Sequence, residues 1–339
     1  RLTTFVLTPV FFSTLTIILV YLVSYKIYRS DVLSIIASLL YATIPLFVAA
    51  GRITKGDCLL ALVLISTVLC ILKYAECKKK QYVIFAGLLA GVSFWCKEIG
   101  ICALVIMPVL FGRRGLIKEA GISAGIGVFV ALGYLLYNYL INPHAFFKIL
   151  SLYSAHQSRP SFNMVVTYIR DPKIVLSYAG FGMGYLLWCW FVLVYSMGKR
   201  DATVPITAFI FLMTVCVLVQ DTLPFGWYIM PLYPFMAIAG GLFLRDFISR
   251  PNTAKALLLL LVLMAVPLKE ILPGELYRSP WLFRGYLAIG IIPFLAFDFR
   301  KNRITGIVAK TTCYIYISLA IMMNVYIVYH LQDLYDPLK

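Results

Sequence analysis

The sequence has few charged residues, and acidic residues are especially scarce. Only 13% of the 339 residues are Asp, Glu, Lys or Arg, and 14 acidic residues stand against 30 basic ones. A soluble domain has about 25% charged residues, most of them on its surface. With 62% hydrophobic residues and a mean hydropathy of +0.91, this chain cannot build such a surface, which excludes a soluble globular protein.

The chain also lacks a disulfide framework and a metal-binding pattern. Its eight cysteines lie in or beside apolar runs, apart from Cys77 in a connector, and none has the spacing of metal ligands. We expect the cysteines to be small packing residues. Of the three histidines, His144 and His330 are expected to be structural.

Long apolar runs are abundant instead. A helix needs about 20 apolar residues to cross a bilayer, and about twelve such runs recur along the chain. A membrane β-barrel is excluded because these runs are apolar on every side and do not alternate. We predict an all-α fold, a polytopic transmembrane helical bundle that forms one domain over residues 1–339. The span centres are Ile17, Leu40, Leu64, Leu88, Val105, Val128, Leu186, Phe211, Ala237, Leu260, Ile291 and Leu319.

The distribution of Lys and Arg predicts the orientation. Connectors rich in basic residues, such as 78–80 and 113–118, alternate with connectors that hold fewer. The positive-inside rule makes the rich connectors cytosolic and places Arg52, Lys55 and Asp57 outside the cytosol. The net charge of +16 is therefore read as topology and attraction to anionic lipid, with no nucleic-acid partner indicated.

One apolar run, from Gln81 to Gly112, is interrupted by Lys97 and Glu98. A single helix of this length would extend about 48 Å, too long for one ordinary crossing. Because both flanks are basic, the run must go out and return. Each arm is then slightly shorter than the membrane core, so Lys97 and Glu98 are predicted at a recessed turn below the outer surface.

The longest outer connector is the segment 142–173. Its first part, from Phe146 to Tyr153, has apolar residues at helical spacing with polar residues between them. This pattern is typical of a helix that lies in the membrane interface. We predict that the segment caps the outer mouth of the bundle.

Ordinary explanations exist for the outer charges. Arg52 and Asp57 would serve as interfacial anchors or as a local salt bridge. Lys97 and Glu98 would neutralise each other, although neighbouring residues on a turn point apart. His156 would be a polar loop residue. The sharper hypothesis is that basic groups recessed at a lipid boundary bind a lipid phosphate, whose charge needs charge-assisted donors.

Several motifs carry a resemblance to a known family. The chain reads "RLTT", then "ATIPLFVAAGRITKGDCLL", then "WCKEIG", with looser matches at "YSAHQSRP" and "GWYIMPLYPFMAIAGG". In this order they resemble the membrane glycosyltransferases of the protein O-mannosyltransferase and aminoarabinose transferase group, which have the GT-C fold. Cys96 stands where the family has Thr, and Ala155 where it tends to have an acid.

The resemblance implies a function. Family members transfer a sugar from a polyprenyl-phosphate donor to an acceptor hydroxyl on the non-cytosolic face, with inversion. It implies that Arg52, Lys97, Arg159 and His156 bind the donor phosphate, His156 contacting a divalent metal in some relatives. Further expected substrate-binding residues are Lys55, Asp57, Glu98, Trp227 and Tyr228. No cofactor is firmly implied, and the membrane is a prokaryotic plasma membrane or the endoplasmic reticulum.

The family's general base is an Asp in the first outer loop, which would lie upstream of Arg1. We therefore expect this chain to lack the catalytic base. Two other classes stay open on the sequence: a transporter or flippase of a lipid-linked or anionic substrate, and a non-catalytic membrane scaffold.

Overall fold

A computed structural model describes residues 2–52, 56–156, 183–199, 201–218, 226–260 and 280–330 of the chain. Within these ranges all regular structure is helical, which confirms the predicted all-α fold. The elements in chain order are α1 (Leu2–Tyr28), α2 (Asp31–Thr43), α3 (Pro45–Arg52), α4 (Gly56–Cys77), α5 (Gln81–Cys96), the 3₁₀ turn η1 (Glu98–Ile101), α6 (Cys102–Gly112), α7 (Ile117–Ile141), α8 (Pro143–His156), α11 (Met183–Met197), α12 (Thr203–Leu218), the 3₁₀ turn η2 (Gly226–Leu232), α13 (Tyr233–Ser249), α14 (Thr253–Leu258), α17 (Pro280–Phe299) and α18 (Arg303–His330).

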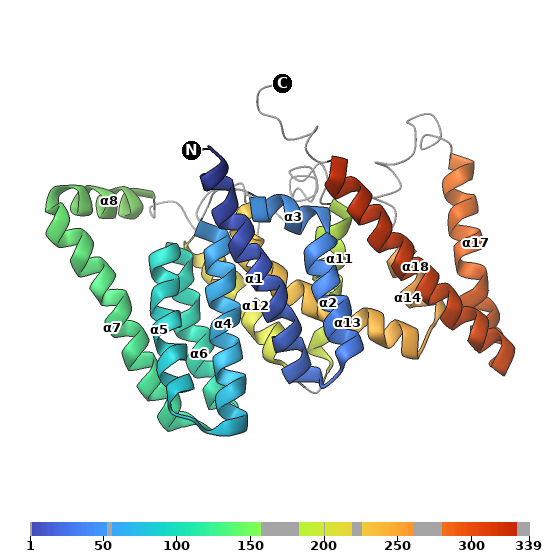
Figure 1. Ribbon diagram of the computed structural model, residues 1–339, viewed down its shortest axis with the longest axis horizontal. Coiled ribbons are helices and arrows are strands. Elements are labelled where there is room, and N and C mark those ends of the chain that lie inside the picture. The colour runs from blue at the N-terminus through green and yellow to red at the C-terminus, as the bar shows by residue number, and fades with distance from the viewer. Residues whose placement is uncertain are drawn as a thin grey trace.

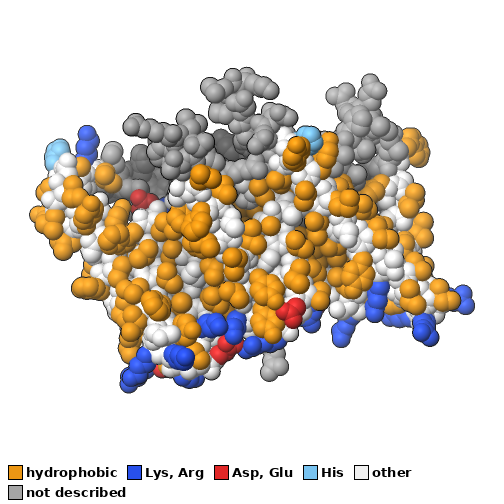
Figure 2. Space-filling view, in the orientation of Figure 1, with side chains coloured by type: hydrophobic (Ala, Val, Ile, Leu, Met, Phe, Trp, Pro, Cys, Tyr) orange, Lys and Arg blue, Asp and Glu red, His pale blue; other side chains and the backbone are white. Residues whose placement is uncertain are grey.

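Apolar side chains cover most of the visible face of the bundle between its two ends (Figure 2). Large apolar residues such as Phe129 (79% exposed) and Ile289 (72% exposed) would face water in a soluble protein. Among the described residues, five helices are long and apolar enough to cross a membrane by themselves. All predicted span centres lie in described helices except Leu260, which comes just after α14. The count of about twelve crossings stays a prediction.

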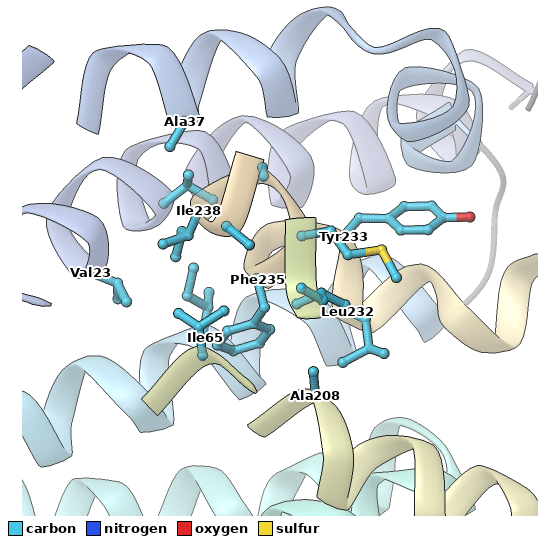
Figure 3. Packing of buried hydrophobic residues seen from close by; sticks show 14 of the residues in the cluster. Val23, Ala37, Ile65, Ala208, Leu232, Tyr233, Phe235 and Ile238 are labelled. Atoms are coloured by element: carbon cyan, nitrogen blue, oxygen red, sulfur yellow. The ribbon is translucent and has the colours of Figure 1, made fainter. Parts of the chain in front are cut away.

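The centre of the bundle is α13. Its residues from Tyr233 to Leu244 are buried, and Figure 3 shows Phe235 and Ile238 among side chains from α1, α2, α4 and α12. Two glycines let neighbouring helices approach closely, because a Cβ on Gly240 would lie 2.5 Å from Trp188 and one on Gly241 would lie 2.9 Å from the Leu33 carbonyl oxygen. The hydrophobic effect does not drive helices together in lipid. Small residues instead let the helix backbones approach closely, so that van der Waals packing stabilises the contact.

The second predicted span is broken in the structure. The second predicted span is centred at Leu40, but α2 ends at Thr43 and Ile44 is extended, with φ −60° and ψ 119°. The ring of Pro45 disfavours a helical conformation at the residue before it. The chain then turns, and α3 lies across the end of the bundle (Figure 1).

The two ends of the bundle differ in charge. Most of the visible Lys and Arg side chains gather along one rim, at the bottom of Figure 2. This rim, called the basic rim below, carries the α4–α5, α6–α7 and α17–α18 connectors (Figure 1). α3 and α8 lie at the opposite end, where α8 extends across the end of α7 as expected for an interfacial helix. The remainder of the predicted cap, 157–173, lies outside the described residues.

Candidate functional site

The candidate site is a buried ion pair between two helix ends. Lys97 Nζ lies 2.7 Å from Asp57 Oδ1 and donates a hydrogen bond to it. The Asp57 side chain is 1% exposed, and that of Lys97 is 20% exposed. A buried carboxylate is costly unless a partner compensates its charge. Asp57 therefore holds the lysine ammonium at a fixed place where one side remains accessible.

The backbone favours this pair electrostatically. Asp57 lies in the first turn of α4, and Lys97 is the residue that ends α5. An acid near a helix N-terminus and a base near a helix C-terminus both complement the helix dipole. Gly56 makes the approach possible, since a Cβ at this position would lie 2.6 Å from the Cys96 carbonyl oxygen. The sequence "KGD" thus brings the two helix ends into contact.

The predicted turn within the run 81–112 is confirmed. Lys97 is extended, with φ −168° and ψ 150°, and separates α5 from η1 and α6. Ser93 Oγ donates to the carbonyl oxygens of Ala90 and Gly100, both at 2.6 Å. Gly100 is required because a Cβ there would lie 1.9 Å from the Ser93 carbonyl oxygen. Figure 1 shows α5 and α6 side by side, with α5 ending below the level of α3 and α8, which agrees with a recessed turn.

The other motif segments meet at the same end of the bundle. η2, which carries the backbone of Trp227 and Tyr228, packs against α3 and α4, and η1 packs against α12. The rings of Phe47 in α3 and Tyr233 at the start of α13 stack with centroids 4.5 Å apart. Three stretches of the sequence, α3–α4, α5–η1 and the more distant η2–α13, therefore surround one region.

The structure tests the predicted site residues unequally. Asp57 and Lys97 come together, and Glu98 lies next to them on an exposed position of η1. Lys55 and Arg159 lie outside the described residues. For the other predicted residues the structure describes the helical backbone and not the side chain: Arg52 at the end of α3, His156 at the end of α8, and Trp227 and Tyr228 in η2.

Asp57 has Lys97 as an ion-pair partner, forty residues along the chain. A local salt bridge between Arg52 and Asp57 stays a prediction, because the Arg52 side chain lies outside the described part of the structure. Among the described residues, no group of three His, Cys, Asp or Glu side chains is arranged to hold a metal ion.

Sequence reasoning missed residues that position the pair. Ser93 and Gly100 hold the turn, yet neither has a distinctive sequence signal beyond a small residue near a charged dipeptide. Gly51 lies against α1, where a Cβ would be 2.7 Å from Ser13 Oγ. A glycine just before a charged helix end, as in "AAGR" and "TKGD", is the one signal available.

A family model and two solved structures are similar to this chain. Residues 2–139, which include Asp57 and Lys97, match the model of the dolichyl-phosphate-mannose-protein mannosyltransferase family. No curated protein matches the sequence of the chain. The fold resembles two crystal structures of ArnT from Cupriavidus metallidurans. The form bound to undecaprenyl phosphate has a TM-score of 0.52 and the apo form 0.53, both at 16% identity over 94% of this chain.

The chain corresponds to 63% and 62% of the length of those two ArnT chains, less than two thirds. At this identity the likeness establishes the fold, and the family match covers the part that holds the buried ion pair. The chain is a membrane protein with a GT-C fold, similar to the protein O-mannosyltransferase and aminoarabinose transferase group.

Proposed function

We propose that this chain takes part in the transfer of a sugar from a polyprenyl-phosphate donor to an acceptor hydroxyl. One observation carries the proposal: a lysine ammonium held by a buried carboxylate at the end of the bundle opposite the basic rim. The family match over 2–139 supports it, as does the likeness to ArnT, one of whose structures is described as bound to undecaprenyl phosphate.

Cleavage of a sugar–phosphate bond is favoured by a cation next to the phosphate. When the bond between the sugar and the phosphate breaks, negative charge grows on the departing lipid phosphate. A preorganised cation stabilises this charge without having to reorient during the reaction. Asp57 fixes the Lys97 ammonium through a 2.7 Å hydrogen bond, so Lys97 is the group that contacts the phosphate and Asp57 is a positioning residue.

The other predicted residues are assigned by their elements. Arg52 ends α3, directly before the stretch that leads to Asp57, and we propose it as a second phosphate-binding cation. We propose that His156, the last residue of α8, and Arg159 of the cap segment also bind the donor phosphate. Glu98 and Lys55 would contact the sugar, and Trp227 and Tyr228 would pack against the sugar or the prenyl chain.

Topology supports a reaction on the non-cytosolic face. The basic rim lies opposite the end of the bundle that carries the start of α4 and the end of α5 (Figure 1), where Asp57 and Lys97 form their ion pair. Short connectors rich in Lys and Arg are cytosolic as a rule. A lipid-linked donor would reach the pair along the apolar surface, with its phosphate at the level of the α5–α6 turn. The proposed acceptor hydroxyl then enters from the non-cytosolic side.

The test is transfer from a radiolabelled polyprenyl-phosphate sugar by the full-length protein in membranes. Lys97→Ala and Arg52→Ala are each expected to reduce transfer about 100- to 1000-fold, the usual loss when one electrostatic stabiliser is removed. Lys97→Arg should retain more activity than Lys97→Ala, because it keeps the charge.

Lys148→Ala is the matched control, because Lys148 is an exposed lysine on α8. It should leave transfer unchanged, and all variants should insert into the membrane equally. Activity near wild type in both Lys97→Ala and Arg52→Ala would remove these residues from the mechanism. Movement of the donor across the membrane without sugar transfer would favour a flippase.

A further inference from the structure

The basic rim contains a hollow that the proposed reaction does not use. It has a volume of about 680 Å³ and is formed by the ends of α13 and α17, the connectors that follow them, and the start of α18. We call it the basic hollow. Its lining residues are Ser249, Arg250, Pro251, Asn252, Phe297, Asp298, Lys301, Asn302, Arg303, Gly306, Ile307 and Lys310.

The basic hollow has an excess of uncommitted positive charge. It contains four basic residues and one acid, Asp298. The acid is already engaged, since Asp298 Oδ2 accepts hydrogen bonds from the Thr253 backbone nitrogen at 2.9 Å and from Thr253 Oγ1 at 2.6 Å. The four basic side chains are exposed, namely Arg250, Lys301, Arg303 and Lys310. None of them has an ion-pair partner within the described part of the chain.

A neighbouring hollow shows the contrast. It has a volume of about 820 Å³ and shares Ser249 and Arg250 with the basic hollow. Two of its lysines are committed: Lys199 binds Asp246 at 2.6 Å, and Lys255 donates to the Asp246 and Arg250 carbonyl oxygens, both at 3.0 Å. Burial works to lower the pKa of Lys199, but hydrogen bonds with Asp246 and Tyr195 raise that pKa above its ordinary value. The neighbouring hollow therefore neutralises much of its own charge.

The position of the basic hollow points to a lipid. α17 and α18 lie at one side of the bundle, at the right of Figure 1. Apolar side chains on these helices are highly exposed next to the hollow, namely Ile304 (72%), Ile307 (57%) and Phe299 (88%). An anion that also carries acyl chains fits both features, because basic pockets between membrane helices on the cytoplasmic side bind anionic headgroups.

We propose that the basic hollow binds the phosphodiester headgroup of an anionic phospholipid from the leaflet at the basic rim. The phosphate lies among the guanidinium and ammonium groups of Arg250, Lys301, Arg303 and Lys310. The acyl chains extend along the exposed apolar face of α18 towards the membrane core. Soluble phosphate shares the chemistry of the headgroup but gains nothing from this apolar face.

The test is a titration of the purified protein in detergent, followed by native mass spectrometry. The probes are phosphatidylglycerol, which is anionic, phosphatidylcholine, which carries the same phosphodiester without net charge, and inorganic phosphate. The variant Lys301→Gln/Arg303→Gln removes two charges from the hollow. Neither residue has a described partner, and Arg303 begins α18, where a positive charge opposes the helix dipole, so folding should be preserved.

Lys79→Gln/Lys80→Gln is the matched control, since both lysines are exposed on the α4–α5 connector of the same rim. We expect phosphatidylglycerol to bind better than phosphatidylcholine, and Lys301→Gln/Arg303→Gln to weaken its binding about tenfold or more. The control should bind phosphatidylglycerol as the wild type does. Unfolding temperatures in lipid-free detergent should be equal for both variants.

Three results would overturn the proposal. Equal weakening by both double variants would mean that general surface charge attracts the lipid. Equal binding of phosphatidylglycerol and phosphatidylcholine would mean that the hollow does not recognise net charge. Displacement of the lipid by inorganic phosphate at similar concentration would assign the site to a soluble anion. Sugar transfer is not part of this readout, so the lipid site and the proposed reaction can fail separately.

Discussion

At the end of the bundle that carries α3 and the α5–α6 turn, the described ion pair is buried and its two members are fixed by helix ends in close contact. Asp57 is 1% exposed and Lys97 20% exposed. At the basic rim, by contrast, Arg250, Lys301 and Arg303 are exposed around an open hollow. The same kinds of side chain are therefore presented in two different ways.

Glycine environments differ in parallel with the charges. A Cβ on Gly56 or Gly100 would collide with a backbone carbonyl oxygen, at 2.6 Å and 1.9 Å. Gly112 and Gly115, near the basic rim, have no atom within 4 Å of such a Cβ. One end is thus preorganised by tight backbone packing, which suits a reaction that needs a fixed cation. The other end is open, which suits a mobile lipid headgroup.

Among substitutions that disturb the tightly packed end of the bundle, we expect the largest effect on stability at the α5–α6 turn. Gly100→Ala places a methyl group against the Ser93 carbonyl oxygen, which belongs to the backbone and cannot rotate away. We expect a loss of about 3 kcal/mol in the free energy of unfolding. Thermal unfolding of the purified protein in detergent measures it.

Gly112→Ala is the matched control for Gly100→Ala, because it adds the same methyl group to open space at the other end of α6. Its unfolding temperature should equal that of the wild type or exceed it. Equal stability of the two variants would show that the turn is not tightly packed.

A smaller effect is expected at Gly56. The added methyl group of Gly56→Ala would push the start of α4 away from Cys96 and lengthen the contact between Asp57 and Lys97, although every charge is kept. Because a misplacement of about 1 Å can cost about a hundredfold in rate, transfer should fall by that order. Steady-state transfer kinetics in membranes with equal amounts of protein provide the measurement. Unchanged transfer would show that activity does not depend on the contact between Asp57 and Lys97.

The smallest effect is expected for a second ion pair, which is more exposed than the pair of Asp57 and Lys97. Lys199 and Asp246 form an ion pair near the basic rim, with side chains 32% and 23% exposed. Partly exposed pairs contribute up to about 1 kcal/mol, so Lys199→Met should change the unfolding temperature little and leave transfer unchanged. A loss of transfer comparable to that of Lys97→Ala would mean that both ends of the bundle take part in the reaction.

Much of the fold could be predicted from the sequence because lipid imposes simple rules. Apolar length predicted the helices, and the basic flanks of 81–112 with Lys97 and Glu98 at its centre predicted the turn. The break at Ile44 was not predicted, although Pro45 is visible in the sequence. Proline is tolerated inside many membrane helices, as Pro9 is in α1, so its presence alone does not decide whether a span breaks.

The candidate site could be predicted only in part. Charge in an apolar context identified Asp57 and Lys97, but their pairing depends on how α4 and α5 pack, which no local pattern encodes. For the basic hollow the sequence predicts only that its basic connectors are cytosolic, because the lining comes from separate helix ends and connectors between residues 249 and 310. Concave arrangement, rather than composition, distinguishes it from the rest of the rim.

The central claim is that Lys97, held by Asp57, binds the phosphate of a prenyl carrier. Its most direct test is a titration of undecaprenyl phosphate against the purified wild type, Lys97→Met and Asp57→Asn/Lys97→Met, read by native mass spectrometry. The double variant removes the unpaired buried carboxylate that Lys97→Met alone would leave. Binding about tenfold to a hundredfold weaker in both variants is the predicted result. Wild-type affinity in both would contradict it.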